Sequence, residues 1–108
     1  MNMRRLYVLV RTDLERSSPA LQAGHAVAEF MIEHPDCDWQ NHYLIYLKVK
    51  SLEQLMNWKS KLCVSANSSK ESALLKHTTF SEPDLNNEMT ALAVYGVNAS
   101  IFKRLRLL

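Results

Sequence analysis

Two short segments of this chain concentrate the side chains that acid–base chemistry uses. The first is Arg11-Thr12-Asp13, followed by Gln22 and His25. The second, residues 82–90, holds three carboxylates and two side-chain amides. Histidine suits a general acid or base, because its unperturbed pKa of about 6.5 lies near neutrality. Carboxylates and amides within one loop offer bases and hydrogen-bond donors together, so the two segments are candidate parts of one catalytic site.

Each of these residues also has a structural interpretation. His25 can be a core or boundary residue that hydrogen-bonds a backbone carbonyl. Arg11 and Asp13 can simply pair with each other, and Gln22 can close the first turn of its helix instead of binding a substrate. Three residues of the second segment are natural turn formers, because their side chains hydrogen-bond their own backbone: Asp84, Asn86 and Asn87. Residue types alone leave both interpretations open.

The elements that must position these side chains can be read from apolar patterns. Residues 6–10 are a continuous β-prone run, typical of a strand buried on both faces. Ser17 or Ser18 can cap a helix over residues 19–33, whose first position is a proline. Gly24 in mid-helix costs about 1 kcal/mol relative to alanine, so we expect a close neighbour there. The apolar stripe expected on this helix has these members: Leu21, Gly24 or His25, Ala28, and Met31 or Ile32.

The later elements complete an α/β pattern. A strand over residues 42–49, a Ser51-capped helix, strands near residues 74–80 and 89–97, and a short terminal helix are expected. Between the second helix and the third strand we expect either a loop at Asn67-Ser68-Ser69 or a helix that continues, or a second helical turn, through Ala73. The terminal helix would carry four apolar residues: Ile101, Phe102, Leu105 and Leu108. The order β-α-β-α-β-β-α predicts one domain over residues 1–108. We expect a three-layer sandwich, a mixed four-stranded sheet with helices on both faces.

Composition restricts the class of protein. The chain has 108 residues, 47% of them apolar and 22% charged, with a net charge of +2. No apolar run approaches the roughly 20 residues that cross a bilayer, so a cytoplasmic protein without membrane contact is expected. The two cysteines are expected as reduced thiols, and no motif suggests a metal or another cofactor. Basic residues gather near both ends; they form one basic edge if the termini meet, or else solvated ends of elements.

Two motifs resemble those of the type-2 peptidyl-tRNA hydrolases. Leu9-Val10-Arg11-Thr12-Asp13-Leu14 is similar to the Arg-x-Asp-Leu end of the family's first strand. Residues 20–26, Ala-Leu-Gln-Ala-Gly-His-Ala, are similar to its Ala-x-Gln-x-x-His-Ala helix. A looser likeness runs through residues 45–49 and 90–94 to the Leu-Arg-Leu-Leu ending. Two family features are not matched: Ser17 and Ser18 stand where the family has Gly-Lys, and its Asp-x-Gly-Arg-Thr segment has no counterpart in place.

The resemblance implies hydrolysis of the ester between a peptidyl or aminoacyl group and the 3′ end of tRNA. His25 or Asp84 is then expected as the base, with Asn87 as an oxyanion donor and Thr90 also in the catalytic set. The residues expected to bind substrate are Arg11, Asp13, Arg16, Gln22, Glu82 and Asn86. The alternatives are a non-catalytic tRNA-binding or RNA-binding relative, and a protein-interaction domain of the same fold; a homodimer is possible in either case.

Overall fold

The first strand occupies an inner position in the sheet, as its apolar run predicts. The computed structural model describes residues 4–68 and 76–108, without the side chains of residues 63–68. One four-stranded sheet has the order β2-β1-β4-β3, in which β1 is parallel to β2 and the other two pairs are antiparallel. The strands are β1 (Arg5–Arg11), β2 (Tyr43–Val49), β3 (Lys76–Glu82) and β4 (Glu88–Tyr95).

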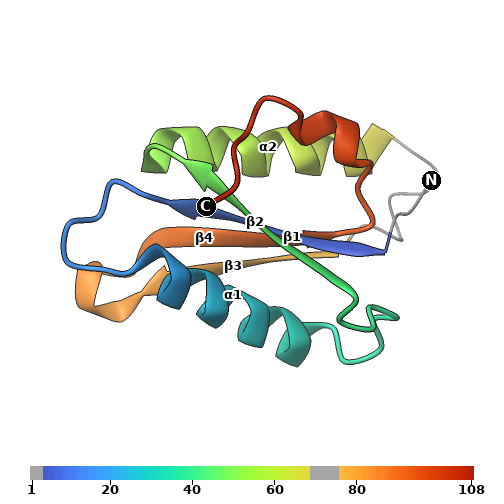
Figure 1. Cartoon of the computed structure of the whole chain (residues 1–108), viewed down its shortest axis with the longest axis horizontal. Helices are drawn as coiled ribbons and strands as arrows, with labels where there is room; N and C mark the ends of the chain where they lie inside the picture. The colour runs from blue at the N-terminus through green and yellow to red at the C-terminus, as the bar shows by residue number, and fades with distance from the viewer. Residues whose placement is uncertain (1–3, 69–75) are drawn as a thin grey trace.

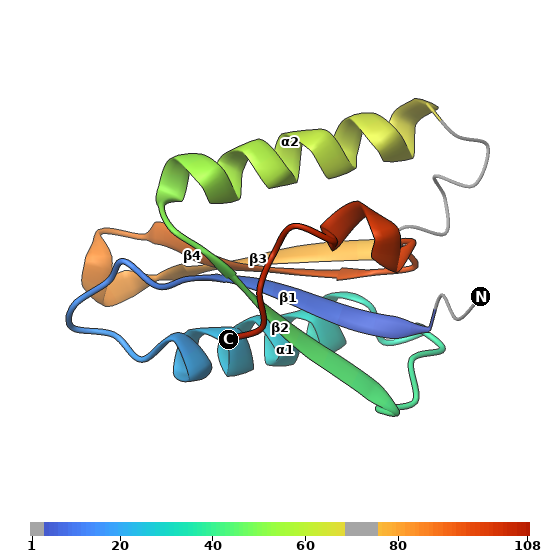
Figure 2. The ribbon, with the colours of Figure 1, turned by 45° about the horizontal axis from the view of Figure 1, so that its top comes forward.

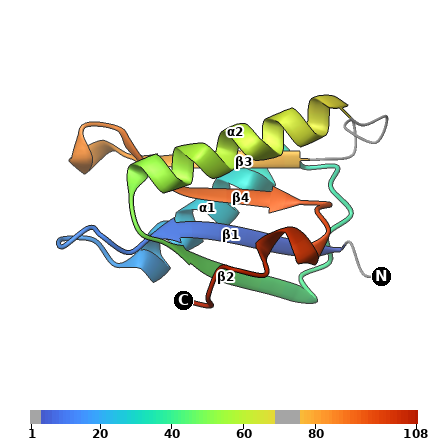
Figure 3. The ribbon, with the colours of Figure 1, turned by 90° about the horizontal axis from the view of Figure 1, so that it is seen from above.

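Helices cover both faces of this sheet, so the predicted three-layer sandwich is confirmed. α1 (Pro19–Glu33) lies on one face, and α2 (Leu52–Ser68) lies on the other (Figures 1 and 2). The 3₁₀ turn η3 (Ala99–Phe102) shares the face of α2, as the view from above shows (Figure 3). No helix in the described ranges is long and apolar enough to span a membrane.

Alternate residues of β1 supply two separate cores. Leu6, Val8 and Val10 pack with Ala23, Ala26 and Phe30 of α1. Tyr7 and Leu9 point the other way and pack with a second cluster: Leu47, Val49, Leu55, Leu62, Leu92, Val94 and Phe102. Each fully buried side chain of this size contributes about 1.5–3 kcal/mol relative to exposure. The inner strand therefore fixes the distance between both helices and the sheet.

α1 has the predicted bounds, but a different face is buried. Ser18 caps it by accepting a hydrogen bond from the Leu21 backbone N–H. The buried residues are Gln22, Ala23, Ala26 and Phe30, whereas Leu21, Met31 and Ile32 are exposed. The predicted stripe is therefore wrong, because α1 packs on the sheet with a polar residue, Gln22, on its buried face. The close neighbour expected at Gly24 is also absent, since a Cβ there would meet no described atom within 4 Å.

The later elements depart from the expected bounds in part. α2 continues through Asn67 and Ser68, which fits the continued helix rather than the loop; Ser69 lies outside the described residues. The described part of β3 begins at Lys76, so the expected start of this strand near residue 74 also lies outside. The predicted terminal helix is only the turn η3. Beyond it, Leu107 forms an antiparallel bridge with Leu47, because the edge of β2 offers unpaired backbone groups.

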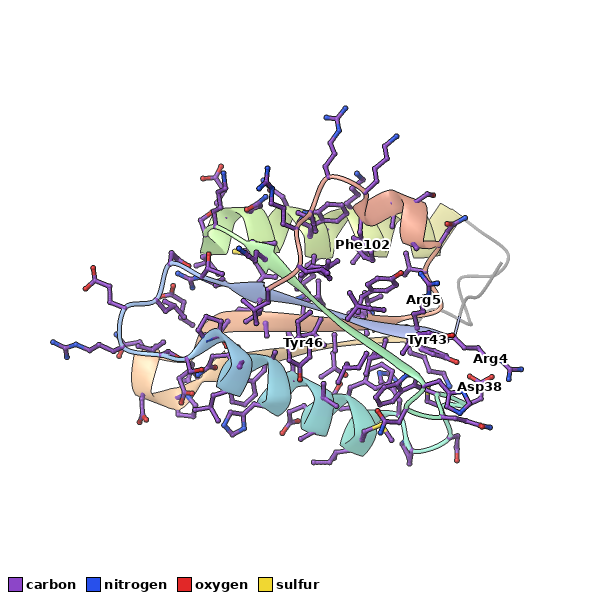
Figure 4. The ribbon with its side chains drawn as sticks, in the orientation of Figure 1. Arg4, Arg5, Asp38, Tyr43, Tyr46 and Phe102 are labelled. Atoms are coloured by element: carbon purple, nitrogen blue, oxygen red, sulfur yellow. The ribbon has the colours of Figure 1, made fainter. Side chains whose placement is uncertain are left out.

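The basic residues near the termini do not form one edge. Arg4 and Arg5 lie at the start of β1 and Arg11 at its end, about 20 Å away at about 3.3 Å per residue. Arg4 approaches Asp38, with 3.9 Å between Nε and Oδ2, and the Arg5 guanidinium lies over the Tyr43 ring (Figure 4). Cys37 is a free thiol, and the side chain of Cys63 lies outside the described residues.

Gly24→Ala should stabilise the protein, because its helix gains propensity and the new methyl group meets open space. We expect the free energy of unfolding to rise by about 1 kcal/mol in urea titrations. The reverse change at an exposed position of the same helix, Ala28→Gly, is the control and should cost about as much. Loss of stability in Gly24→Ala would show that the space beside Gly24 is occupied.

Candidate active site

Arg11 is a buried cation that ties two distant segments together at the end of β1. It is 4% exposed. Its Nε and Nη2 donate to the two carboxylate oxygens of Asp13, at 2.9 and 2.7 Å. Nη1 donates to the Glu88 carboxylate and, at 3.1 Å, to the Met89 carbonyl oxygen. Four of its five N–H groups are thus engaged.

This ion-pair network explains the ionisation of its members. The Arg11 guanidinium, by hydrogen-bonding Asp13, holds the pKa of that carboxyl below its ordinary value. The same contact raises the pKa of Arg11. Two carboxylates therefore neutralise one guanidinium, and Arg11 has little left to offer a phosphate. The structure shows the pairing that was the structural alternative for Arg11 and Asp13, and their expected contacts with a substrate stay a prediction.

Gln22 is the second buried polar residue, and it joins three parts of the chain. Its Nε2 donates to Ser17 Oγ at 2.6 Å and to Glu82 Oε2 at 2.9 Å. Its Oε1 accepts a 2.7 Å hydrogen bond from Thr90 Oγ1. Gln22 is 2% exposed and Thr90 is fully buried, so neither side chain reaches solvent as placed. The expected binding role of Gln22 and the expected catalytic role of Thr90 stay predictions; in the structure Thr90 holds the Gln22 amide, which in turn bonds Glu82.

Glu82 opens a tightly turned loop whose polar side chains face outward. Its backbone carbonyl accepts from the Asn87 N–H at 3.1 Å, and its Oε1 accepts from the Asp84 N–H at 3.3 Å. After Glu82 come the 3₁₀ turn η2 (Pro83–Leu85) and then two asparagines, Asn86 and Asn87, whose backbone φ angles are 55° and 60°. Turn formation therefore does explain these residue types. It also leaves the side chains of Asp84, Asn86 and Asn87 exposed.

The Glu82 carboxylate is held in its charged form. The Gln22 amide, the Asp84 N–H and the nearby positive charge of His25 together keep the pKa of Glu82 below its ordinary value. The two hydrogen bonds lower this pKa more than the charge of His25 does. A fixed negative charge therefore stands at the start of the loop.

His25 lies one helical turn beyond Gln22, on the exposed side of α1. Its ring stacks on Phe80 of β3, with 4.6 Å between ring centroids and 11° between ring planes. Within residues 4–68 and 76–108, no hydrogen bond holds its ring nitrogens. The contact with Phe80 therefore orients the ring, and the residue is exposed. The structural alternative for His25 is thus met in part, because the ring packs on Phe80 as a boundary residue, without the backbone-carbonyl partner that was expected.

The expected residues thus separate into two layers at one end of the sheet. Arg11, Gln22 and Thr90 form a closed inner layer. The exposed outer layer contains His25, Arg16, Asp84, Asn86 and Asn87. Sequence reasoning missed Ser17, Phe80 and Glu88 as the contacts of Gln22, His25 and Arg11, because partners between 5 and 77 positions away leave no local pattern.

A hollow of about 570 Å³ adjoins the loop on the α2 face of the sheet. Asn87, Glu88 and Met89 form one wall, and Met56 and Lys59 of α2 form the opposite one. His25 and Phe80 belong to the α1 face, so the loop lies between the histidine and the hollow. In the described ranges, no cluster of three His, Cys, Asp or Glu side chains is arranged to hold a metal ion.

Comparison with known proteins assigns no family to this chain. No family model matches it, and no curated protein matches its sequence. The likeness to type-2 peptidyl-tRNA hydrolases therefore rests on the motif residues themselves. Functional inference depends on those residues and on the geometry that connects them.

Thr90→Val tests the buried contact between Thr90 and Gln22. It keeps the side-chain volume but leaves Gln22 Oε1 buried without a donor, which should cost about 1–3 kcal/mol in urea unfolding. In a Gln22→Met background the same change should cost clearly less, because no amide remains to satisfy. Thr78→Val, which removes a hydroxyl bonded to Glu33, should cost the same in both backgrounds. Equal costs of Thr90→Val in the two backgrounds would contradict the network.

Asp13→Asn tests the ion pair through its pH dependence. Because folding lowers the pKa of Asp13, its contribution is present above the unfolded value of about 4 and disappears as the pH falls through the folded value. At pH 7 we expect a loss of about 1–2 kcal/mol, the lower part of the range for hydrogen bonds to charged groups. As the pH falls below about 4 and then through the folded pKa, the variant and the parent should converge, whereas exposed Asp36→Asn should match the parent throughout. A constant difference down to about pH 2 would contradict the pairing.

Proposed function

We propose that this chain hydrolyses the ester that joins a peptidyl or aminoacyl group to the 3′ end of tRNA. One observation carries the proposal: the Gln22 amide bonds both Glu82 and Thr90 and so brings the helix of His25 against the loop of Asp84 and Asn87. Gln22 and His25 belong to the motif that resembles the family's first helix, whereas Asp84 and Asn87 are candidates because of the residue types in their loop. A tRNA substrate also places the protein in the cytoplasm.

His25 is the first candidate for the base that activates water. Its ring is oriented by Phe80, and the residue is exposed. The ionised Glu82 nearby attracts the imidazolium that forms when His25 takes a proton from water. The same imidazolium then returns the proton to the departing ribose oxygen. Asp84, exposed at the turn, is the second candidate for the base.

The loop after Glu82 supplies the remaining requirements of ester cleavage. Attack by water creates an oxyanion, which needs N–H donors aimed at it. Asn87 offers its side-chain amide at the rim of the hollow beside α2. Arg16, the exposed cation before α1, is available for a terminal phosphate in place of the family's lysine.

A tRNA-binding protein without hydrolytic activity is the second candidate. The closed inner layer favours this candidate. The side chains of Arg11, Gln22 and Thr90 all have hydrogen-bond partners within the protein and need none from a substrate. In that case the outer loop would contact the tRNA end without cleaving it. Turnover distinguishes the two candidates directly.

The proposal predicts release of tRNA from diacetyl-lysyl-tRNA by the purified protein. If His25 is the base, His25→Gln should lower the rate by about 10²–10⁴-fold, because that is the usual contribution of general acid–base catalysis. Asp84→Asn should do so if Asp84 is the base. His42→Gln and Asp36→Asn, exposed residues of the same types, are the controls and should keep the parental rate. No ester cleavage above buffer would contradict hydrolysis, and full activity of both site variants would contradict the assignment of the base.

A further inference from the structure

Four cations surround one hollow beside the edge strand β2. Lys48 and Lys50 come from the end of β2 and the residue after it, and Arg104 and Arg106 come from the C-terminal tail. Gln54 and Leu105 complete the lining of a hollow of about 420 Å³. All four basic side chains belong to exposed residues. Among the residues that the structure describes, none of the four forms an ion pair with a carboxylate.

Backbone contacts bring these cations together. The Lys48 N–H donates to the Arg106 carbonyl at 2.9 Å, and the Leu108 N–H donates to the Tyr46 carbonyl at 3.0 Å. Leu105 packs against the second core. The tail therefore runs past β2 to the C-terminus, held by these hydrogen bonds and one isolated bridge (Figure 3). Like charges repel, so we expect the gathering of four cations around one hollow to oppose folding until an anion neutralises it.

The chemistry of the lining fits phosphate groups. Arginine presents a planar fork of donors that matches phosphate oxygens, and lysine contributes a point charge. The hollow is larger than one phosphate and opens at the surface, which suits successive groups of an extended polyanion. Gln54 lies in the first turn of α2, whose positive dipole end adds attraction for an anion. Glu53, on the same turn, is not among the lining residues.

The hollow lies at the same end of the sheet as the candidate active site. Lys48 pairs with Val10, one residue before Arg11, and the Thr12 N–H donates to the Val49 carbonyl at 3.0 Å. The active-site loop and the hollow are therefore separated by the width of the inner strands, on one edge of the molecule. A single polynucleotide can contact both.

We propose that this hollow binds backbone phosphates of an RNA and thereby holds a tRNA whose 3′ end reaches the loop at residues 82–90. The inference rests on the proposed function for the identity of the RNA, since tRNA is the substrate proposed there. Binding itself does not require the ester. Deacylated tRNA is therefore the probe, because its affinity is measured without any turnover.

The test compares a double variant of the hollow with a charge-matched control. Lys48→Gln with Arg106→Gln removes two lining charges, and Lys76→Gln with Lys103→Gln removes two basic side chains that do not line it. Filter binding at low salt should show at least a tenfold weaker affinity for the first pair. The slope of log affinity against log salt should fall by about 2, because each removed cation neutralises about one phosphate. Equal affinities of the two double variants would overturn the proposal.

Further arms identify the source of the phosphate. Inorganic phosphate should displace tRNA no better than chloride at equal ionic strength; much stronger displacement would indicate an isolated phosphate site and overturn the RNA assignment. Binding to phosphatidylserine vesicles that depends on the hollow, with unchanged tRNA binding, would also overturn it. Urea unfolding of the first double variant should be unchanged or shifted to higher urea; marked destabilisation would overturn the view that these charges oppose folding.

The two proposals fail separately. Hollow-dependent binding of deacylated tRNA without ester cleavage would contradict hydrolysis alone. If the protein cleaves the ester but the Lys48→Gln, Arg106→Gln variant binds tRNA as tightly as its control, only the phosphate site is contradicted.

Discussion

The buried amide of Gln22 is the contact on which the candidate site depends. A buried amide without partners costs free energy comparable to a missing hydrogen bond or more. Ser17, Glu82 and Thr90 must therefore be in place once α1 packs on the sheet. The shape of the loop after Glu82 is consequently set by folding, before any ligand arrives. This is a form of preorganisation, obtained from a residue that does not itself reach the surface.

Charge is divided between the loop at residues 82–90 and the C-terminal tail at this end of the sheet. The loop side carries the carboxylates of Asp13, Glu82 and Glu88, partly neutralised by Arg11. The side of the C-terminal tail carries four cations around one hollow. An RNA would meet attraction at the hollow and repulsion at the loop. Such a division favours one orientation of a polyanion, with its backbone on the basic side and only its terminus near the carboxylates.

Secondary structure followed from local chemistry where several signals agreed. The run at residues 6–10 became the inner strand, and the serine–proline start placed the first helix at its observed bounds. The buried face of that helix did not follow, because the apolar pattern was ambiguous and a buried glutamine turned it. The prediction of a terminal helix was wrong for a similar reason. The tail forms a bridge with the unpaired edge of β2, whereas helical spacing alone predicted that the helix would continue.

The sequence by itself determined the α/β class, the order of the elements and the polar residue types at the ends of β1 and β3. Only the tertiary structure decided which of those residues are exposed, since burial depends on partners between 5 and 77 positions away. It turned Arg11, Gln22 and Thr90 into an inner support and left His25, Asp84 and Asn87 outside. It also assembled the basic hollow from two segments that no spacing rule connects. The physical reason is that hydrogen bonds and charges act through space, whereas sequence patterns report only neighbours along one element.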